Sequence, residues 1–502
     1  MNKNKVAVLG LDGLSWYYLI KMLPNTPILR RVISKSLKSI LDSYPPITYA
    51  SWTSVLTGVN PGKHGIFNFT YVDRKTWTQK INTALDNKYP RIHEMLGMLK
   101  VPNIMVNPIP DFPILSISNT YIVSHGFFYP KVLYSPSSFK KYVKILPKSY
   151  GYSLENMPSF LENYVEFLEE TIIKLDWNLY WINLPIPDLY LHKNYFLLDK
   201  ATTNTIEKKI FHLIDKIVKI LVNEADALAI VSDHGFSRYT KAVGVNDILL
   251  RLGLVIPSYS SSTHGSREFL DILHEKLSAQ EAKKSRPFML RLFGTIVNVI
   301  PSYIRRHFRK ILKKVFKTHK LNKVFTLRNI PIDLRRSLAF VDAYSTFGIY
   351  VKKPELISYI IRKISRNPCI KWAKPREQIF WGENILKLPE IVFDLNYDHG
   401  CGAIVSGIGG REIVVRSEMF GWHHPKGVFV IYSPDLYISP NKIITLKNYH
   451  VTPLIMCLLN VPLHKRMDGV DLAIKLMSIK KPKFYNYYEK WQVTRRIALL
   501  RK

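Results

Sequence analysis

Short apolar runs that end in polar residues alternate with longer amphipathic segments, and this alternation restricts the fold more than any other feature. Five runs are predicted to be buried parallel strands: Val6–Leu11, Asn103–Val106, Trp177–Leu184, Ala227–Val231 and Val428–Tyr432. Between them, Phe160–Lys174 and Thr203–Asn223 carry apolar residues at three- and four-residue steps, which is typical of amphipathic helices. The alternation predicts an α/β fold with a mostly parallel central sheet.

The composition supports a globular chain with an anionic partner. Hydrophobic residues make up 47% of the 502 residues, enough for a large buried core, so disordered and fibrous classes are excluded. The formal net charge is +34. Such an excess predicts attraction to phosphate esters, nucleic acid or acidic lipid headgroups.

Cysteine usage and hydropathy bear on the compartment. Cys369, Cys401 and Cys457 are far apart and form no CxxC pair, so we expect neither a disulfide framework nor a cysteine zinc cluster. The first apolar run meets Asp12 at once, which indicates a strand rather than a signal peptide. No run reaches the roughly 18 to 20 apolar residues of a spanning helix. We expect a cytoplasmic protein, with peripheral attachment to the inner membrane surface as an option.

Acidic residues follow two of the predicted strands. Asp12 comes after Val6–Leu11, and Asp233 with His234 comes after Ala227–Val231. Alone, an Asp–Gly turn is most often structural. Chemistry gathers at the carboxyl ends of the strands in such a sheet, so two strands that end in acid are a useful coincidence, and Asp233 with His234 forms a candidate metal half-site.

Three further ligand candidates lie elsewhere. Asp188 and His192 stand four residues apart and would share one face of a helix, and a histidine pair at 423 and 424 precedes another strand. Each is weak alone, since solvated or core histidines are commoner. Together with the strand-end residues they would supply two oxygen and nitrogen sites for divalent cations.

A hydroxyl completes this chemistry. Thr48 lies just before a helix-like run in PPITYASWTSVLTGVNPGKHGI. Two cations can lower the pKa of such a hydroxyl and hold the attacking and leaving oxygens of a phosphoryl displacement. Near a helix N-terminus, free backbone N–H groups would also favour a phosphate.

The ordered motifs LGLDG, PPITYASWTSVLTGVNPGKHGI, DLYLH, SDHGF and GWHHPKGVF resemble those of the alkaline phosphatase superfamily. More narrowly, the chain resembles the type I phosphodiesterase / nucleotide pyrophosphatase group and related predicted phosphohydrolases or phosphomutases. The resemblance covers about residues 5–250 and 335–475. It implies an alkaline-phosphatase-like three-layer sandwich.

The resemblance also implies roles for single residues. One metal would be held by Asp12, Asp233 and His234 and would contact Thr48, and the other by Asp188, His192 and His423. His423 is preferred to His424 because it fits a Gly-x-His pattern with a glycine four residues later. Thr48 would attack phosphorus and form a covalent phosphothreonine that water hydrolyses. Zn²⁺ is the expected metal, with Mn²⁺ as the alternative.

One position departs from the group's pattern. Nucleotide pyrophosphatases usually carry a phosphoryl-binding asparagine three residues after the nucleophile, and here that position is Ser51. We expect Ser51 to bind substrate, although a hydroxyl reaches less far than an amide. His64 is expected to be structural.

Several activities stay open. The context of Thr48 excludes a sulfatase, and the lack of spanning helices argues against a phosphoethanolamine transferase. The first hypothesis is a two-metal phosphodiesterase acting on a phosphate ester. The alternatives are a phosphomonoesterase, a phosphomutase, a phosphonate hydrolase, or a catalytically silent basic protein that binds membranes or nucleic acid.

Two basic segments lie outside the motifs. Residues 1–250 and 335–475 are predicted to form a discontinuous catalytic core, interrupted by a basic helical insertion at 251–334 and followed by a basic tail at 476–502. Fourteen Lys or Arg residues fall between Lys283 and Arg328. An amphipathic basic helix at 302–320 would be a solvated face, an anionic-membrane contact or, less favoured, a nucleic-acid contact.

Overall fold

The computed structural model describes residues 4–125, 132–146, 153–199, 203–258, 330–343, 346–405, 407–433 and 443–500. The predicted basic helix at 302–320 and most of the predicted insertion lie outside these residues.

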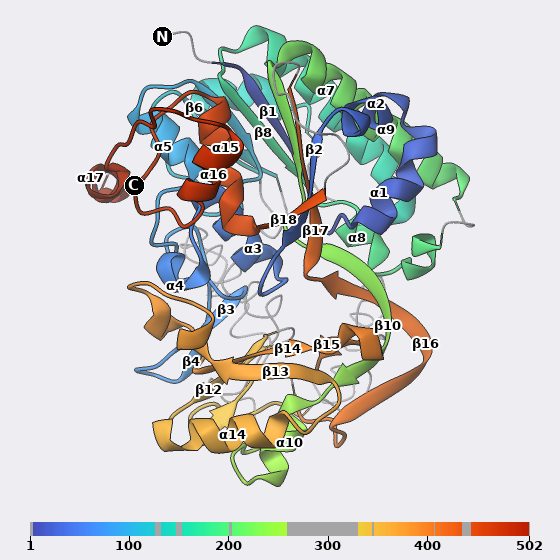
Figure 1. The fold of residues 1–502 in the computed structure, drawn as a ribbon, viewed down its shortest axis with the longest axis vertical. Coiled ribbons are helices and arrows are strands. Elements are labelled where there is room, and N and C mark those ends of the chain that lie inside the picture. Colours follow the sequence, from blue (N-terminus) through green and yellow to red (C-terminus); the bar gives the residue numbers. More distant parts are fainter. Residues whose placement is uncertain are drawn as a thin grey trace, which may run out of the picture.

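A nine-stranded sheet forms the centre of the larger part of the molecule (Figure 1). Its order is β18 (Ile443–Lys447), β2 (Leu37–Asp42), β17 (Lys426–Tyr432), β9 (Ala227–Val231), β1 (Val6–Leu11), β8 (Leu179–Leu184), β5 (Asn103–Val106), β6 (Thr120–Ser124) and β7 (Leu133–Ser135). All five predicted strands are in this sheet. The expected parallel direction is wrong for β17, which runs antiparallel to both β9 and β2.

Helices cover both faces of this sheet, which confirms the predicted three-layer sandwich (Figure 1). Strand β1 shows why: Ala7 and Leu9 pack into one core, whereas Val6 and Val8 pack into the other. The first core includes α1 (Trp16–Met22), α2 (Pro27–Ser34), α6 (Lys140–Val143), α7 (Met157–Lys174) and α9 (Thr205–Glu224). The second includes α3 (Thr48–Thr57), α5 (Ile92–Met98), α15 (Val451–Leu458) and α16 (Val470–Leu476).

Smaller sheets form the other part, drawn at the bottom of Figure 1. One sheet has the order β15 (Cys401–Ile404), β10 (Gly235–Val243) and β16 (Ile413–His424). The next has β11 (Ala339–Phe340), β12 (Gly348–Val351), β14 (Ile391–Leu395) and β13 (Ile370–Pro375), and a hairpin joins β3 (Thr70–Asp73) to β4 (Thr78–Ile81). Their helices are α10 (Val245–Arg251) and α14 (Ile357–Ile364). Because β10 follows β9 directly, this part begins at the edge of the large sheet where β9 ends.

One finding corrects the sequence analysis, and a second adds to it. Cys369 and Cys401 form a disulfide, since the chain returns to place their Cα atoms 5.4 Å apart; only Cys457 among the cysteines is free. Within the predicted tail, α17 (Tyr487–Leu500) docks on the molecule, and the Tyr487 hydroxyl donates to the Pro462 carbonyl at 2.6 Å.

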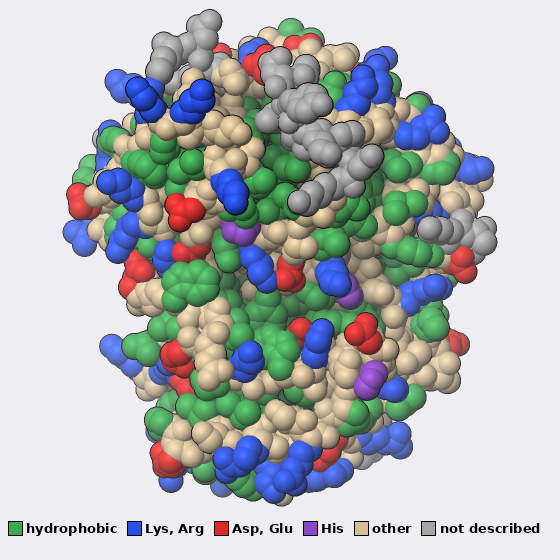
Figure 2. Space-filling model, in the orientation of Figure 1, with side chains coloured by type: hydrophobic (Ala, Val, Ile, Leu, Met, Phe, Trp, Pro, Cys, Tyr) green, Lys and Arg blue, Asp and Glu red, His purple; other side chains and the backbone are tan. Residues whose placement is uncertain are grey.

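The surface is basic without one dominant patch on the face that is drawn. Figure 2 shows Lys and Arg side chains spread over both the upper and the lower part. In the portion of the chain that the structure describes, no helix has the length and apolar character needed to span a bilayer.

Candidate active site

The strand order brings the first ligand candidates together. β1 and β9 are parallel neighbours, so Asp12 and Asp233 emerge side by side at the carboxyl edge of the sheet. The turn after β1 is tight, with Gly13 at φ +70°, and the Gly13 N–H donates to Asp233 Oδ1 at 3.3 Å. A Cβ at Gly13 would lie 2.8 Å from Asp188 Cβ, so this position requires glycine for both conformation and space.

Asp12, Asp233 and His234 form the first ligand group. His234 Nε2 lies 3.3 Å from Asp233 Oδ2 and 3.6 Å from Asp12 Oδ1. All three side chains are buried, and the ligand atoms lie within 4.8 Å of one another. This spacing suits a single cation between them.

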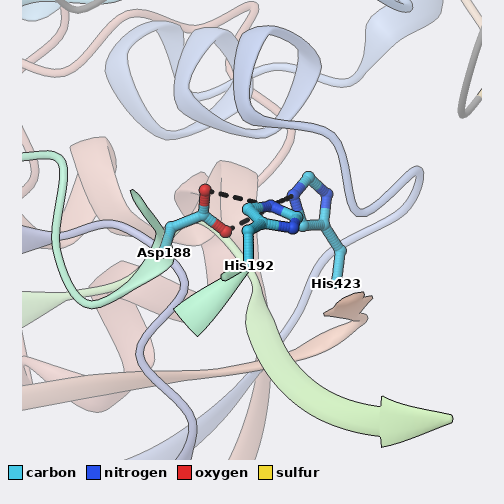
Figure 3. Close-up of side chains that lie close together, drawn as sticks. All are labelled: Asp188, His192 and His423. Carbon is cyan, nitrogen blue, oxygen red and sulfur yellow. Dashed lines mark hydrogen bonds and ion pairs between the residues drawn. The ribbon is translucent and has the colours of Figure 1, made fainter. Parts of the chain in front are cut away.

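Asp188, His192 and His423 form the second group, shown in Figure 3. The one-turn helix α8 (Asp188–Leu191) follows β8; it begins with Asp188, and His192 is its C-cap residue. His192 Nε2 lies 3.3 Å from Asp188 Oδ2. His423 Nε2 lies 3.4 Å from Asp188 Oδ1 and 3.1 Å from His192 Nε2. The strand β16 supplies His423, because its antiparallel register sets Phe236 opposite His423.

The two groups adjoin each other through their histidines. The rings of His234 and His423 are stacked with centroids 4.0 Å apart. His423 Nδ1 lies 2.9 Å from the Pro46 carbonyl and His234 Nδ1 lies 3.0 Å from the Gly235 carbonyl. Since a carbonyl only accepts, each Nδ1 donates to its carbonyl, and each Nε2 is the ring atom that faces its group.

Each of the three carboxylates has a buried oxygen that lacks a hydrogen-bond partner in the described part of the chain. Asp12 Oδ1, Asp188 Oδ1 and Asp233 Oδ2 are buried without a hydrogen-bond partner among the described residues. Burial raises the pKa of Asp12 and of Asp233 well above the ordinary value, and neighbouring carboxylates raise both further. For Asp188, burial acts in the same direction, but His192 and His423 outweigh it and hold the pKa well below the ordinary value. These residues therefore fit two divalent cations.

Thr48 is the first residue of α3, and its hydroxyl Oγ1 lies 3.3 Å from His234 Nε2. No side chain among the described residues caps this helix, whose N-cap residue is Ile47. A helix N-terminus without a side-chain cap favours an anion, here beside the Thr48 hydroxyl.

The structure places the other predicted residues as follows. Ser51 is fully buried, and its hydroxyl donates to the Pro45 carbonyl at 2.9 Å. His64 contacts Ser54 Oγ at 2.9 Å and accepts from the Ile66 N–H, and burial lowers its pKa to about 3, in keeping with a structural role. His424 is half-buried, and its Nδ1 accepts from the Lys426 N–H rather than joining either group.

One contributor escaped the sequence analysis. The Trp52 indole N–H donates to Asp12 Oδ2 at 3.2 Å and so fixes that carboxylate. The signal was present, because Trp52 stands four residues after Thr48 and such residues share one helix face. The need for glycine at position 13 was also not predicted, although a glycine that follows a strand-end aspartate suggests a positive φ.

Comparisons with known proteins agree with the fold. Residues 6–286 match the family model described as type I phosphodiesterase / nucleotide pyrophosphatase. No curated protein matches the chain. Phosphonoacetate hydrolase from Sinorhizobium meliloti 1021, in complex with phosphonoacetate, is similar with a TM-score of 0.57 and 12% identity, over 91% of this chain and 96% of that one.

A second solved structure is murine ectonucleotide pyrophosphatase / phosphodiesterase 5, with a TM-score of 0.49, 13% identity, and coverage of 93% of this chain and 99% of that one. That similarity is too low to carry an argument, and the bacterial one, at 12% identity, shows the fold alone. The family model, in contrast, spans more than half of the chain. The chain therefore belongs to the type I phosphodiesterase / nucleotide pyrophosphatase family of phosphoric ester hydrolases.

Proposed function

We propose that the protein is a phosphodiesterase that uses two divalent cations and Thr48 as its nucleophile. The observation that carries this proposal is the juxtaposition of the Thr48 hydroxyl with two adjoining ligand groups that hold three buried carboxylate oxygens without a hydrogen-bond partner among the described residues. The cations, when bound, would lower the pKa of the Thr48 hydroxyl and neutralise charge on the phosphoryl group.

The chain's own groups account for binding and attack. The backbone N–H groups at the start of α3 would bind a phosphoryl oxygen and place phosphorus beside Thr48 Oγ1. The Thr48 oxygen would then form a bond to phosphorus while the bond to the leaving ester oxygen breaks, giving a phosphothreonine that water hydrolyses. Trp52 would hold the Asp12 carboxylate in place during both steps.

Ser51 remains a predicted substrate ligand, and the structure gives that role little support. Its hydroxyl has one proton, which is directed to the Pro45 carbonyl. Substrate binding through Ser51 would need that bond to break. We therefore expect Ser51→Ala to change KM by less than about threefold, a difference of under roughly 1 kcal/mol.

The test compares an aryl phosphate diester with an aryl phosphate monoester, each with chelator, Zn²⁺ or Mn²⁺. Thr48→Ala should lower diester turnover by on the order of 10³-fold or more. Thr53→Ala is a matched control, since Thr53 is equally buried in α3 and donates only to the Tyr49 carbonyl. Equal loss in both variants, or turnover that ignores chelation, would refute the proposal. Faster monoester cleavage, or release of phosphate from a phosphonate, would instead support the corresponding alternative.

The remaining expectations are proposals of the same kind. Zn²⁺ suits the mixed aspartate and histidine groups, and metal analysis of purified protein checks it. The division into a core, an insertion at 251–334 and a tail at 476–502 rests on sequence, as does the anionic-membrane contact of 302–320. Co-sedimentation with anionic liposomes, lost on deletion of 286–320, would support that contact.

The Cys369–Cys401 disulfide argues against the cytoplasmic location, because such bonds are rare in reducing compartments.

A further inference from the structure

Helix α8 is an unusual support for two metal ligands. It comprises Asp188–Leu191, and His192 is its C-cap residue. One turn of helix cannot hold itself in place, because helix formation becomes favourable only over much longer segments. Something outside α8 must therefore fix the second ligand group.

A buried hydrogen-bond chain reaches α8 from the helices beside it. Tyr190, which lies between the two ligands in sequence, has its hydroxyl 2.9 Å from the Tyr18 hydroxyl on α1. The Tyr18 hydroxyl donates to Glu207 Oε1 on α9 at 2.6 Å, so it accepts its second bond from Tyr190. Figure 1 shows α1 next to α8 on the same side of the sheet.

A second set of hydrogen bonds, made by Lys21, holds the segment that follows α8. Lys21 Nζ donates to both Glu207 carboxylate oxygens at 2.9 Å and also to the carbonyl of Leu197. Leu197 belongs to a short 3-10 helix, Tyr195–Leu198, which comes directly after the His192 turn. The segment from Asp188 to Leu198 is thus tied at two points to one carboxylate.

That carboxylate is itself firmly placed. The Lys21 and Glu207 side chains are 1% and 0% exposed. The Glu207 N–H is bound to Asn204 Oδ1 at 2.8 Å, at the N-cap of α9. Water cannot replace any partner at this depth, so loss of one bond leaves a buried polar group unpaired.

We infer that Tyr18, Lys21, Glu207 and Tyr190 are positioning residues that preorganise Asp188 and His192 for the second cation. The inference rests on the proposed function, because it assumes that this group binds a cation. None of the four is among the ligand atoms of either group. Asp12, Asp233 and His234 are placed instead by the ends of β1 and β9 and by Trp52, and the Asp188 N–H donates to the Asp12 carbonyl at 3.0 Å, so we expect the larger effect at the second group.

The experiment measures bound cation rather than turnover. Wild type, Tyr18→Phe and Tyr180→Phe are dialysed against a series of buffered free Zn²⁺ concentrations, and zinc per chain is determined. Tyr180→Phe is the matched control: Tyr180 is equally buried and its hydroxyl pairs with Thr171 Oγ1 at 2.7 Å, away from α8. Glu207→Gln is a second, more severe variant.

We expect wild type and Tyr180→Phe to bind two ions. Tyr18→Phe should bind the first ion as wild type does and the second about tenfold more weakly, the lower end of the effect of losing an outer-shell partner. Two unchanged affinities in folded Tyr18→Phe, or equal weakening at both sites, would overturn the inference while leaving the proposed function intact. Two bound ions with no ester cleavage would overturn the proposed function alone. Wild type that binds neither Zn²⁺ nor Mn²⁺, each tested in the same dialysis series, would overturn both.

Discussion

Replacing Gly13 by alanine should damage the active site in a way that can be separated from ordinary backbone strain. Gly13 has φ +70°, a conformation that costs an L-residue about 1–2 kcal/mol. The new Cβ would also lie 2.8 Å from Asp188 Cβ and 3.2 Å from Asp188 Cα. Forcing such overlap in a packed interior costs a further 1–3 kcal/mol or so. We expect Gly13→Ala to lower the free energy of unfolding by about 2–5 kcal/mol.

Gly253→Ala isolates the contribution of backbone strain. Gly253 has φ +71°, but a Cβ there would meet no atom of the described residues within 4 Å, so only the cost of about 1–2 kcal/mol applies. Both variants are unfolded with denaturant in excess chelator and followed by tryptophan fluorescence, and their zinc affinities are then measured by calorimetry. Gly13→Ala should be the less stable of the two and should bind zinc at least about tenfold more weakly than wild type. Equal stabilities and equal zinc affinities would refute the steric reasoning.

Two further predictions concern the ligand carboxylates. Trp52→Phe removes the donor to Asp12 Oδ2 and should weaken zinc binding about tenfold by calorimetry. Trp181→Phe is the control, because its indole donates to Asn183 Oδ1, and it should leave zinc affinity unchanged. Equal affinities in the two variants would show that the indole bond to Asp12 is dispensable. The pKa values of Asp12 and Asp233 are raised in the folded chain without cations. The stability that their protonated forms contribute is therefore fully present at a pH below the ordinary aspartate pKa, and it is lost as pH rises through the raised pKa values. Cations compete with those protons, so chelator should lower the thermal midpoint more at pH 8 than at pH 5, and the opposite trend would contradict this assignment.

The sequence was informative wherever chemistry lies at the end of a buried strand. Val6–Leu11 and Ala227–Val231 are continuous apolar runs, and the residues after them had to meet at one edge once the two strands became parallel neighbours. Asp12 and Asp233 could therefore be placed at strand ends from the pattern, whereas their assignment with His234 to one metal came from the family resemblance. Thr48 was recognised through its motif, and its position at the start of α3 agrees with the expected helix-like run.

The sequence was less informative where long-range pairing decides the geometry. β17 has the same apolar character as its neighbours, yet it runs antiparallel, and nothing in a run of apolar letters encodes direction. His423 was expected just before a strand, but it lies inside β16, one residue before its end, where the register with β10 sets it opposite Phe236. The chain of bonds from Tyr190 to Glu207 joins residues of ordinary local context, so only the folded structure reveals it.

The strand β16 has a consequence for the order in which the site matures during synthesis. Asp12, Asp233 and His234 have all left the ribosome once the chain has passed the end of β9, whereas Asp188 and His192 must wait for His423, which is made far later. The first ligand group is thus complete in a growing chain that still lacks the last ligand of the second. Under the proposed function, the first cation site would therefore be assembled before the second, which is complete only when β16 pairs with β10.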